Sequence, residues 1–168
     1  MIACHAIDWS SILHRDAIDY YYRKEFRMTT HASRDTTTGL EFEKRVSCKK
    51  DGIDLTKYKL YKYLDSQGID WTKIISRKLL PDEAYWNPVT KELNIFEKKY
   101  QQTEGSADEK PQTCGFKIWE FSKIGKALGA TKVTYTYVLS DWFKQPKYVD
   151  MLEYIASVPE CGYIFMEE

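Results

Sequence analysis

The chain has 168 residues, which corresponds to one domain and is long enough to bury a hydrophobic core. Hydrophobic residues make up 43% of the sequence and charged residues 30%, which are ordinary shares for a soluble globular protein. The formal net charge is zero, which excludes a protein that coats polyanions through its overall charge.

Neither the cysteines nor the hydropathy pattern indicates a secreted or membrane protein. Cys4, Cys48, Cys114 and Cys161 are far apart and form no CxxC pair, so we expect reduced thiols rather than disulfides or a zinc site. The N-terminal residues lack the basic-then-apolar pattern of a signal peptide, and no apolar run approaches the length of a membrane-spanning helix. We therefore expect a cytoplasmic protein with no membrane association.

The first part of the chain shows mainly helical patterns. We expect helices over residues 10–27 and 40–50, the second with Phe42 and Val46 on one face. The stretch 29–39 is rich in hydroxyl side chains and is typical of a loop. Helical spacing returns in the next apolar residues, which are Leu55, Tyr58, Tyr61 and Leu64.

From residue 70 onward the pattern alternates between strands and helices. The β-branched and aromatic runs predict strands over 71–75, 83–86, 93–100, 133–139 and 162–166, and the amphipathic runs predict helices over 116–128 and 148–157. A turn is expected over 87–90 because Asn87 and Pro88 favour chain reversal, and Gly129 is placed to end the preceding helix.

This order of elements predicts one α/β domain spanning residues 1–168. Strands connected by hairpins and followed by a helical crossover favour a mixed central sheet flanked by helices. The sequence shows no repeat and no interdomain linker.

The charges are unevenly distributed even though their sum is zero. Residues 44–78 contain ten Lys or Arg against four Asp, a local excess of six positive charges. Acidic residues gather further on, at Glu92, Glu97, Glu104, Asp108 and Glu109. A basic flank beside a carboxylate cluster is what a metal-dependent nuclease requires, and solvated helix faces also give this pattern.

Three residues form the most informative constellation, Asp82, Glu97 and Lys99. Side chains at i and i+2 of a strand share a face, so Glu97 and Lys99 point the same way, as does Gln101 if the strand continues. The turn over 87–90 lets the chain double back and brings Asp82 towards Glu97. Two carboxylates at adjacent strand ends provide oxygen ligands that suit Mg²⁺.

The lysine beside these carboxylates adds chemistry beyond metal binding. A metal held by a carboxylate pair lowers the pKa of water and screens phosphate charge. An ammonium group on the same face can orient the attacking water and stabilise the charge of the transition state. Alone, Asp82 could be a turn carboxylate and Glu97 and Lys99 part of a solvent-facing edge strand, but their conjunction favours phosphodiester hydrolysis.

Pro81-Asp82 followed by Glu97-Lys98-Lys99 resembles the signature of the PD-(D/E)xK nuclease superfamily, and the run over 95–117 is similar to its restriction-endonuclease branch. The resemblance covers residues 40–139 and implies an αβββαβ core whose first helix is 40–50. It also implies a Mg²⁺ ion held by Asp82 and Glu97, with Lys99 as the catalytic lysine. Glu43 is the candidate for the family's acidic residue on the first helix, with Glu41 as the alternative, and Gln101 is a further helper.

The resemblance implies a site-specific endonuclease that cuts double-stranded DNA. One active site per chain implies a homodimer on a two-fold symmetric sequence. Three alternatives remain open: a structure-specific or homing-type nuclease, a non-catalytic DNA-binding module on the same fold, and an RNA-processing protein, for which RNA-binding motifs are lacking. The sequence has no phosphate-binding glycine motif, so we expect no nucleotide cofactor.

Overall fold

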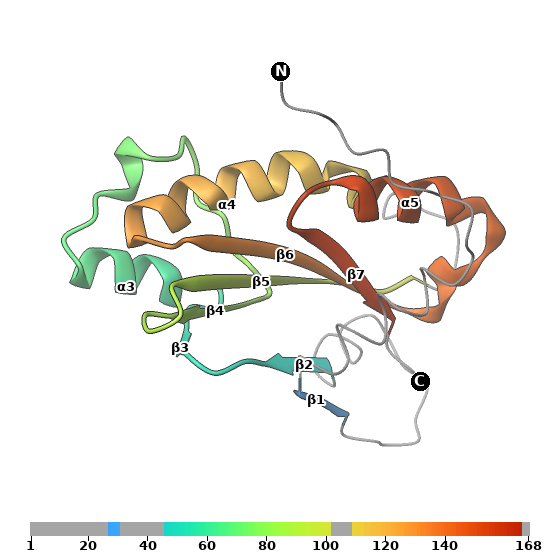
Figure 1. Cartoon of the computed structure of the whole chain (residues 1–168), viewed down its shortest axis with the longest axis horizontal. Coiled ribbons are helices and arrows are strands. Elements are labelled where there is room, and N and C mark those ends of the chain that lie inside the picture. Colours follow the sequence, from blue (N-terminus) through green and yellow to red (C-terminus); the bar gives the residue numbers. More distant parts are fainter. Residues whose placement is uncertain (1–26, 31–45, 102–108, 166–168) are drawn as a thin grey trace.

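The computed structural model describes residues 27–30, 46–101 and 109–165 of the chain. In this part the strands form a two-stranded sheet, β1-β2, and a five-stranded sheet of order β3-β4-β5-β6-β7 (Figure 1). The strands are β1 (Arg27–Thr30), β2 (Val46–Lys49), β3 (Ile53–Asp54), β4 (Glu83–Asn87), β5 (Glu92–Lys99), β6 (Lys132–Leu139) and β7 (Cys161–Phe165).

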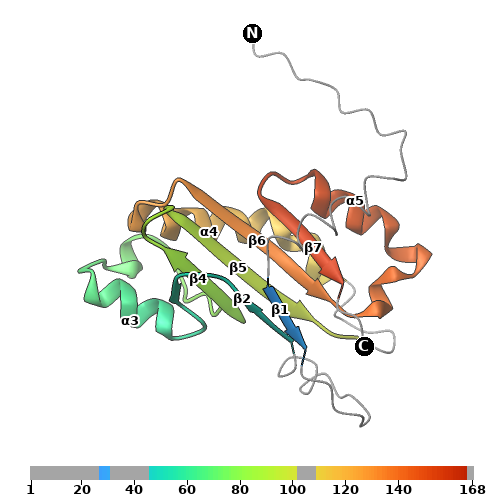
Figure 2. The same cartoon turned by 60° about the horizontal axis from the view of Figure 1, so that its bottom comes forward.

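Helices connect the strands of the larger sheet. The α-helices are α3 (Lys59–Ser66), α4 (Cys114–Leu128) and α5 (Val149–Ser157), and the 3₁₀ turns are η1 (Trp71–Lys73), η2 (Lys110–Thr113), η3 (Asp141–Lys144) and η4 (Pro146–Tyr148). Strands β3, β4 and β5 are antiparallel neighbours, whereas β6 and β7 run parallel to β5. Helices α4 and α5 make the two parallel crossovers and cover one face of the sheet, while the β1-β2 pair lies on the other side (Figures 1 and 2). The chain therefore has the predicted α/β class with a mixed sheet.

The β4-β5 hairpin forms where alternating apolar residues flank a turn sequence. The side-chain oxygen Oδ1 of Asn87 accepts hydrogen bonds from the backbone N–H groups of Val89, at 2.9 Å, and Thr90, at 3.1 Å. Lys91 completes the turn with a left-handed backbone conformation, φ 56°. The turn sets the register in which Glu83 faces Phe96 and Asn87 faces Glu92.

The hydrophobic core lies between the sheet and the helices. The sheet contributes Leu93, Ile95, Tyr135, Tyr137 and Leu139, and α4 contributes Ile118, Phe121 and Ile124. Gly125 brings α4 close to β6, because a Cβ atom at this position would overlap the side chain of Val133. The close approach fixes the height of α4 above β5 and β6.

The opposite face of the sheet carries buried polar groups. Lys98 Nζ lies 2.6 Å from Glu83 Oε1, and less than a tenth of either side chain is exposed. Next to them, Asn94 Oδ1 accepts hydrogen bonds from Lys50 Nζ at 3.0 Å and Thr134 Oγ1 at 2.9 Å. Lys98 thus faces away from Glu97 and Lys99, as strand alternation predicts.

Most of the predicted elements after residue 55 are confirmed. The structure has the expected helix around Tyr61 and Leu64, the hairpin of β4 and β5, and the succession α4, β6, α5 and β7. Helix α4 ends at Gly129 in a left-handed conformation, φ 78°, as expected for a C-terminal glycine cap. Cys114 and Cys161 are free and buried, also as predicted.

Two predicted elements are wrong. Residues 71–75 begin with the 3₁₀ turn η1 rather than a strand, because the Asp70 carboxylate accepts a hydrogen bond from the Thr72 N–H and caps the turn. The helix predicted over 40–50 is contradicted at Val46–Lys49, which form β2 and pair with β1. The loop predicted over 29–39 likewise begins with residues of β1. The helix predicted over 10–27 lies outside the described residues, except that Arg27 begins β1.

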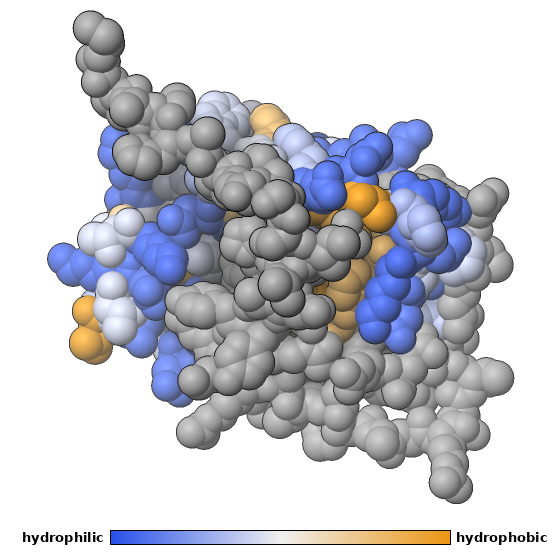
Figure 3. Space-filling view, turned by 45° about the vertical axis from the view of Figure 1, so that its right-hand side comes forward, coloured by the Kyte–Doolittle hydropathy of each residue, from blue (hydrophilic) through white to orange (hydrophobic). Residues whose placement is uncertain are grey.

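The described surface is mostly hydrophilic, with small apolar areas, on the face shown in Figure 3. Among residues 27–30, 46–101 and 109–165, no helix combines the length and apolar character needed to cross a lipid bilayer.

We expect Lys98→Met to lower the free energy of unfolding by about 3–5 kcal/mol, because it leaves the Glu83 carboxylate buried without its cation. Urea unfolding followed by circular dichroism measures the loss. The double variant Lys98→Met/Glu83→Gln should recover most of it, and Lys132→Met, at an exposed position of β6, is the control. A loss for Lys98→Met no larger than that for Lys132→Met contradicts this assignment.

Candidate active site

Backbone contacts fix the segment that leads into Asp82. The Pro81 carbonyl accepts a hydrogen bond from the Lys57 N–H at 3.0 Å, and the Ala84 carbonyl accepts one from the Leu55 N–H at 2.8 Å. The Tyr61 hydroxyl donates to the Leu79 carbonyl at 2.7 Å and accepts from the Leu79 N–H. Burial raises the pKa of Tyr61 to about 12, so the hydroxyl stays protonated. Helix α3 thereby anchors the chain just before β4.

Asp82 lies directly before β4 and is tied to β5. Its Oδ2 atom accepts a hydrogen bond from the Lys98 N–H at 3.0 Å. Because Glu83 pairs with Phe96 in the antiparallel ladder, Asp82 comes opposite Glu97. The hydrogen bond occupies one of the two carboxylate oxygens of Asp82, and the other can serve as a ligand.

Glu97 and Lys99 form an ion pair on the same face of β5. Lys99 Nζ lies 2.5 Å from Glu97 Oε1, with 17% of the lysine side chain and 25% of the glutamate side chain exposed. Both side chains point to the face covered by α4, since they alternate with the buried Lys98. The structure thus brings together the three residues that the sequence singled out.

The electrostatic environment opposes ionisation of Glu97. Burial raises the pKa of this carboxyl above its ordinary value, and the negative charge of Asp82 acts in the same direction. Lys99 and, more weakly, Lys117 favour the ionised form. Two neighbouring carboxylates in a partly desolvated position are stabilised by any cation placed between them.

Two tyrosines of β6 lie beside the carboxylates. Burial is the main reason that the pKa values of Tyr135 and Tyr137 are raised, and the charge of Glu97 contributes to both. Their hydroxyl groups therefore stay protonated near neutral pH. Tyr137 donates a hydrogen bond to the carbonyl of Lys110 at 3.4 Å, which ties η2 to the sheet.

Lys117 of α4 acts electrostatically on the site, although sequence reasoning gave it no role. Its charge acts on Glu97, and its Nζ atom lies 3.6 Å from Glu120 Oε2 within the helix. Lys117 is separated from Glu97 by twenty positions of sequence, and the parallel crossover through α4 brings the two together. In the sequence, Lys117 is the last residue of the stretch 95–117 that resembles restriction endonucleases, and no other sequence feature indicated it.

The other residues predicted to assist catalysis are Gln101 and Glu43, with Glu41 as the alternative to Glu43. Strand β5 ends at Lys99, so strand alternation does not place Gln101 on the face of Glu97. Gln101 is buried, its N–H donates to Ser140 Oγ at 3.2 Å, and this hydroxyl donates to the Gln101 carbonyl at 3.2 Å. Glu43 and its alternative Glu41 lie outside the described residues.

The donor set fits a hard divalent cation. Asp82 and Glu97 offer carboxylate oxygens, and Mg²⁺ commonly binds one or two carboxylates while keeping several waters. Within the described part of the chain, no group of three or more His, Cys, Asp or Glu side chains is placed to hold a metal. A site made of Asp82 and Glu97 therefore relies on water or substrate oxygens to complete the coordination.

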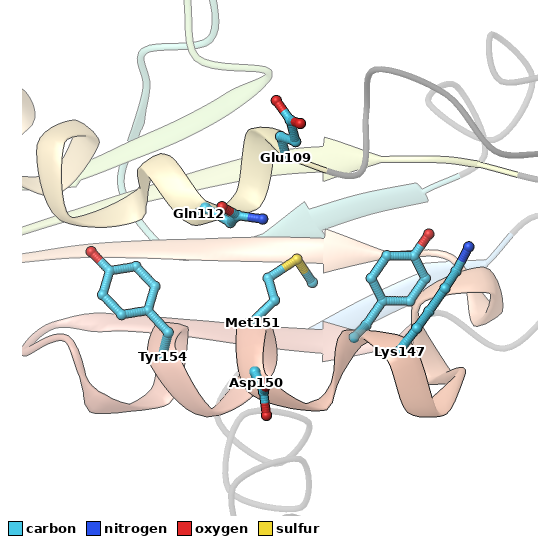
Figure 4. A pocket seen from close by; sticks show the side chains of 7 residues that line it. Glu109, Gln112, Lys147, Asp150, Met151 and Tyr154 are labelled. Atoms are coloured by element: carbon cyan, nitrogen blue, oxygen red, sulfur yellow. The ribbon is translucent and has the colours of Figure 1, made fainter.

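A separate cavity of about 580 Å³ lies between η2 and α5 (Figure 4). It is lined by Glu109, Gln112, Lys147, Tyr148, Asp150, Met151 and Tyr154. Asp82, Glu97 and Lys99 do not line it, and its own charges are two carboxylates and one ammonium group. The cavity is thus distinct from the carboxylate pair.

We expect Glu97 to make the stability of the metal-free protein fall as pH rises. Its folded-state pKa lies above the ordinary glutamate value of 4.5, so between 4.5 and the raised pKa the folded state binds the proton that the unfolded state releases. The free energy of unfolding, measured by urea at a series of pH values, should therefore decrease with pH relative to Glu97→Gln. An increase relative to that variant over the same range contradicts the burial of this carboxyl.

Comparison of the chain with models of protein families, with curated proteins and with solved structures finds no match.

Proposed function

We propose that this protein is a magnesium-dependent endonuclease that hydrolyses phosphodiester bonds of double-stranded DNA. The observation that carries the proposal is the position of Asp82 opposite the Glu97–Lys99 ion pair, at the open end of a hairpin whose register is fixed. Two acids and a lysine on one face are the groups that metal-assisted phosphodiester hydrolysis needs. The partial burial of all three strengthens their electrostatic effects.

Asp82 and Glu97 would hold the ion. Bound there, Mg²⁺ lowers the pKa of a water molecule and screens the negative charge of the phosphate. The hydrogen bond from the Lys98 N–H keeps Asp82 in place before any ion binds. Because the pKa of Glu97 is raised, neutralising its charge is favourable. A divalent cation neutralises this charge without adding a proton.

Lys99 acts on the reacting groups. Its ammonium group, held 2.5 Å from Glu97, is positioned to orient the attacking water and to stabilise negative charge on the phosphate as the bond to water forms. Lys117 supplies a second positive charge from α4. The protonated tyrosines of β6 are buried and respond to the charge of Glu97.

The order of elements supports a restriction-endonuclease-like core. Strands β3, β4 and β5 form an antiparallel meander, and α4 then leads to β6, parallel to β5, which gives the order βββαβ. One difference is that α3 lies between β3 and β4. The first helix of that core was expected over 40–50, where β2 replaces its last residues.

A restriction-endonuclease-like core leads us to expect site-specific cleavage by a homodimer. Each chain carries one set of Asp82, Glu97 and Lys99, so cutting both strands at one site takes two copies. A structure-specific nuclease is the second candidate, and the outer face of α4 favours it, as argued below. Digestion of plasmid DNA with Mg²⁺, followed by sequencing of the ends, distinguishes defined cut sites from scattered ones.

We expect Lys99→Ala to abolish cleavage of DNA, a loss of at least about a hundredfold, while DNA binding is retained. The physical reason is that the variant keeps both metal ligands and removes only the charge that acts on the water and phosphate. Plasmid nicking with Mg²⁺ measures cleavage, and an electrophoretic shift with Ca²⁺ measures binding.

Lys132→Met, which removes an exposed lysine from β6, is the matched control and should cleave like the wild type. Cutting by Lys99→Ala at the wild-type rate would count decisively against this assignment. So would equal digestion by the wild type with Mg²⁺ and with a chelator.

A further inference from the structure

The outer face of α4 carries two exposed aromatic rings and a lysine. Phe116 and Trp119 are 52% and 54% exposed, and their ring centroids lie 5.7 Å apart with an interplanar angle of 31°. Lys123 Nζ lies 3.5 Å from the centroid of the Trp119 ring. These three residues, called the α4 patch below, follow one another at i, i+3 and i+7 on the side opposite the buried Ile118 and Phe121.

The charges of α4 suit a polyanion. The helix contains Lys117, Lys123 and Lys126 and one acidic residue, Glu120, which is buried. Its exposed charges are therefore all positive. An ammonium group in contact with an aromatic ring is a stable cation–π arrangement, and it keeps the lysine at the centre of the patch instead of at its rim.

A protein partner fits this arrangement poorly. The centre of a protein–protein interface is depleted in charged residues, whereas here a lysine lies directly over the ring of Trp119. Any occupant that covers Trp119 must also satisfy the charge of Lys123. A chain of phosphates that carries flat bases satisfies both, because bases stack on aromatic rings and phosphates pair with ammonium groups.

The α4 patch lies on the same helix as Lys117. Lys117, which acts electrostatically on Glu97, sits between Phe116 and Trp119 in the sequence and on the flank of the same helix. From Phe116 to Lys123 the helix rises by about 10 Å, which matches roughly three stacked nucleotides at 3.4 Å each. The Tyr154 hydroxyl of α5 lies 3.1 Å from where a Cβ atom would stand at Gly115, the residue before Phe116.

We propose that the α4 patch binds a single-stranded segment of the nucleic-acid substrate, with bases stacked on Phe116 and Trp119 and a phosphate held by Lys123. The inference rests on the proposed function, because it assigns the patch to the DNA that the carboxylate site cleaves. It narrows the substrate to duplex DNA with an unpaired stretch beside the cleaved bond. In uniform duplex the bases are stacked on each other and their faces are not accessible to the rings.

Binding of a labelled oligothymidylate of about twenty nucleotides, measured by fluorescence anisotropy in a chelator, tests the patch without cleavage. Replacing one stacking ring weakens binding by roughly tenfold, in a range from about fivefold to about a hundredfold, so Phe116→Ala and Trp119→Ala should each show this loss. Trp119→Phe should retain most of the affinity because it keeps a ring. For Lys123→Ala, the slope of log affinity against log salt should fall by about 0.7, the value for one phosphate contact to a single strand.

Val89→Ala is the matched control, since Val89 is 89% exposed at the β4-β5 turn. Thermal unfolding verifies that each variant is folded. Wild-type affinity in both alanine variants, or an equal loss in Val89→Ala, overturns the proposal. A wild-type dimer that Trp119→Ala converts to monomer, measured by sedimentation, also overturns it, because a second copy of the chain would then occupy the patch.

A cleavage assay separates this inference from the proposed function. We expect the wild type to cut a duplex with a single-stranded extension at least several-fold faster than a blunt duplex, and Phe116→Ala/Trp119→Ala to lose that preference. Cleavage with Mg²⁺ but no binding to the oligonucleotide would leave the proposed function standing and refute the role of the patch. Ring-dependent binding without any Mg²⁺-dependent cleavage would support the role of the patch and refute the proposed function.

Discussion

The antiparallel pairing of β4 with β5 is the constraint on which the candidate site depends. It sets Asp82 opposite Glu97, and the hydrogen bond from the Lys98 N–H to Asp82 locks that register at the open end of the hairpin. A slip by one residue would exchange the two faces of β5. Lys98 would then lie beside Asp82, and Glu97 would move to the face that carries Glu83 and Asn94. The buried Lys98–Glu83 pair resists such a slip, since the slip would separate two buried charges that lie 2.6 Å apart.

This fixed register has an electrostatic consequence for Glu97. The same pairing that brings Asp82 near Glu97 also buries Glu97 against α4 and β6, so the carboxyl is poorly solvated and close to a like charge. Lys99 and Lys117 offset this cost in part. The arrangement costs folding free energy, and the proposed metal ion would offset this cost by neutralising the two carboxylates. A purely structural hairpin would gain stability from an apolar residue at this position.

Local sequence patterns predicted the part of the site that lies within one hairpin. Strand alternation separated Glu97 and Lys99 from Lys98, and Asn87-Pro88 located the turn, because both signals depend on neighbours in sequence. Residues 71–75 gave a strand-like apolar pattern, but Asp70 capped a turn instead, a side-chain contact that periodicity does not include. Lys117 could not be placed from the sequence, because its proximity to Glu97 results from the packing of α4 over β5.

In the proposed function, the two sides of α4 have different roles: the inner side acts on the carboxylate site and the outer side binds substrate. The inner side packs on the sheet, and the missing Cβ of Gly125 lets the helix lie low enough for Lys117 to act on Glu97. The outer side does not pack on the sheet, and the aromatic rings there remain about half exposed. An exposed Phe116–Trp119 pair with a lysine on its ring is therefore better explained by a ligand than by folding. Under the proposed function, a nucleic-acid strand bound on the outer face of α4 would be held at a constant distance from the carboxylates, which is the geometry that positioned cleavage requires.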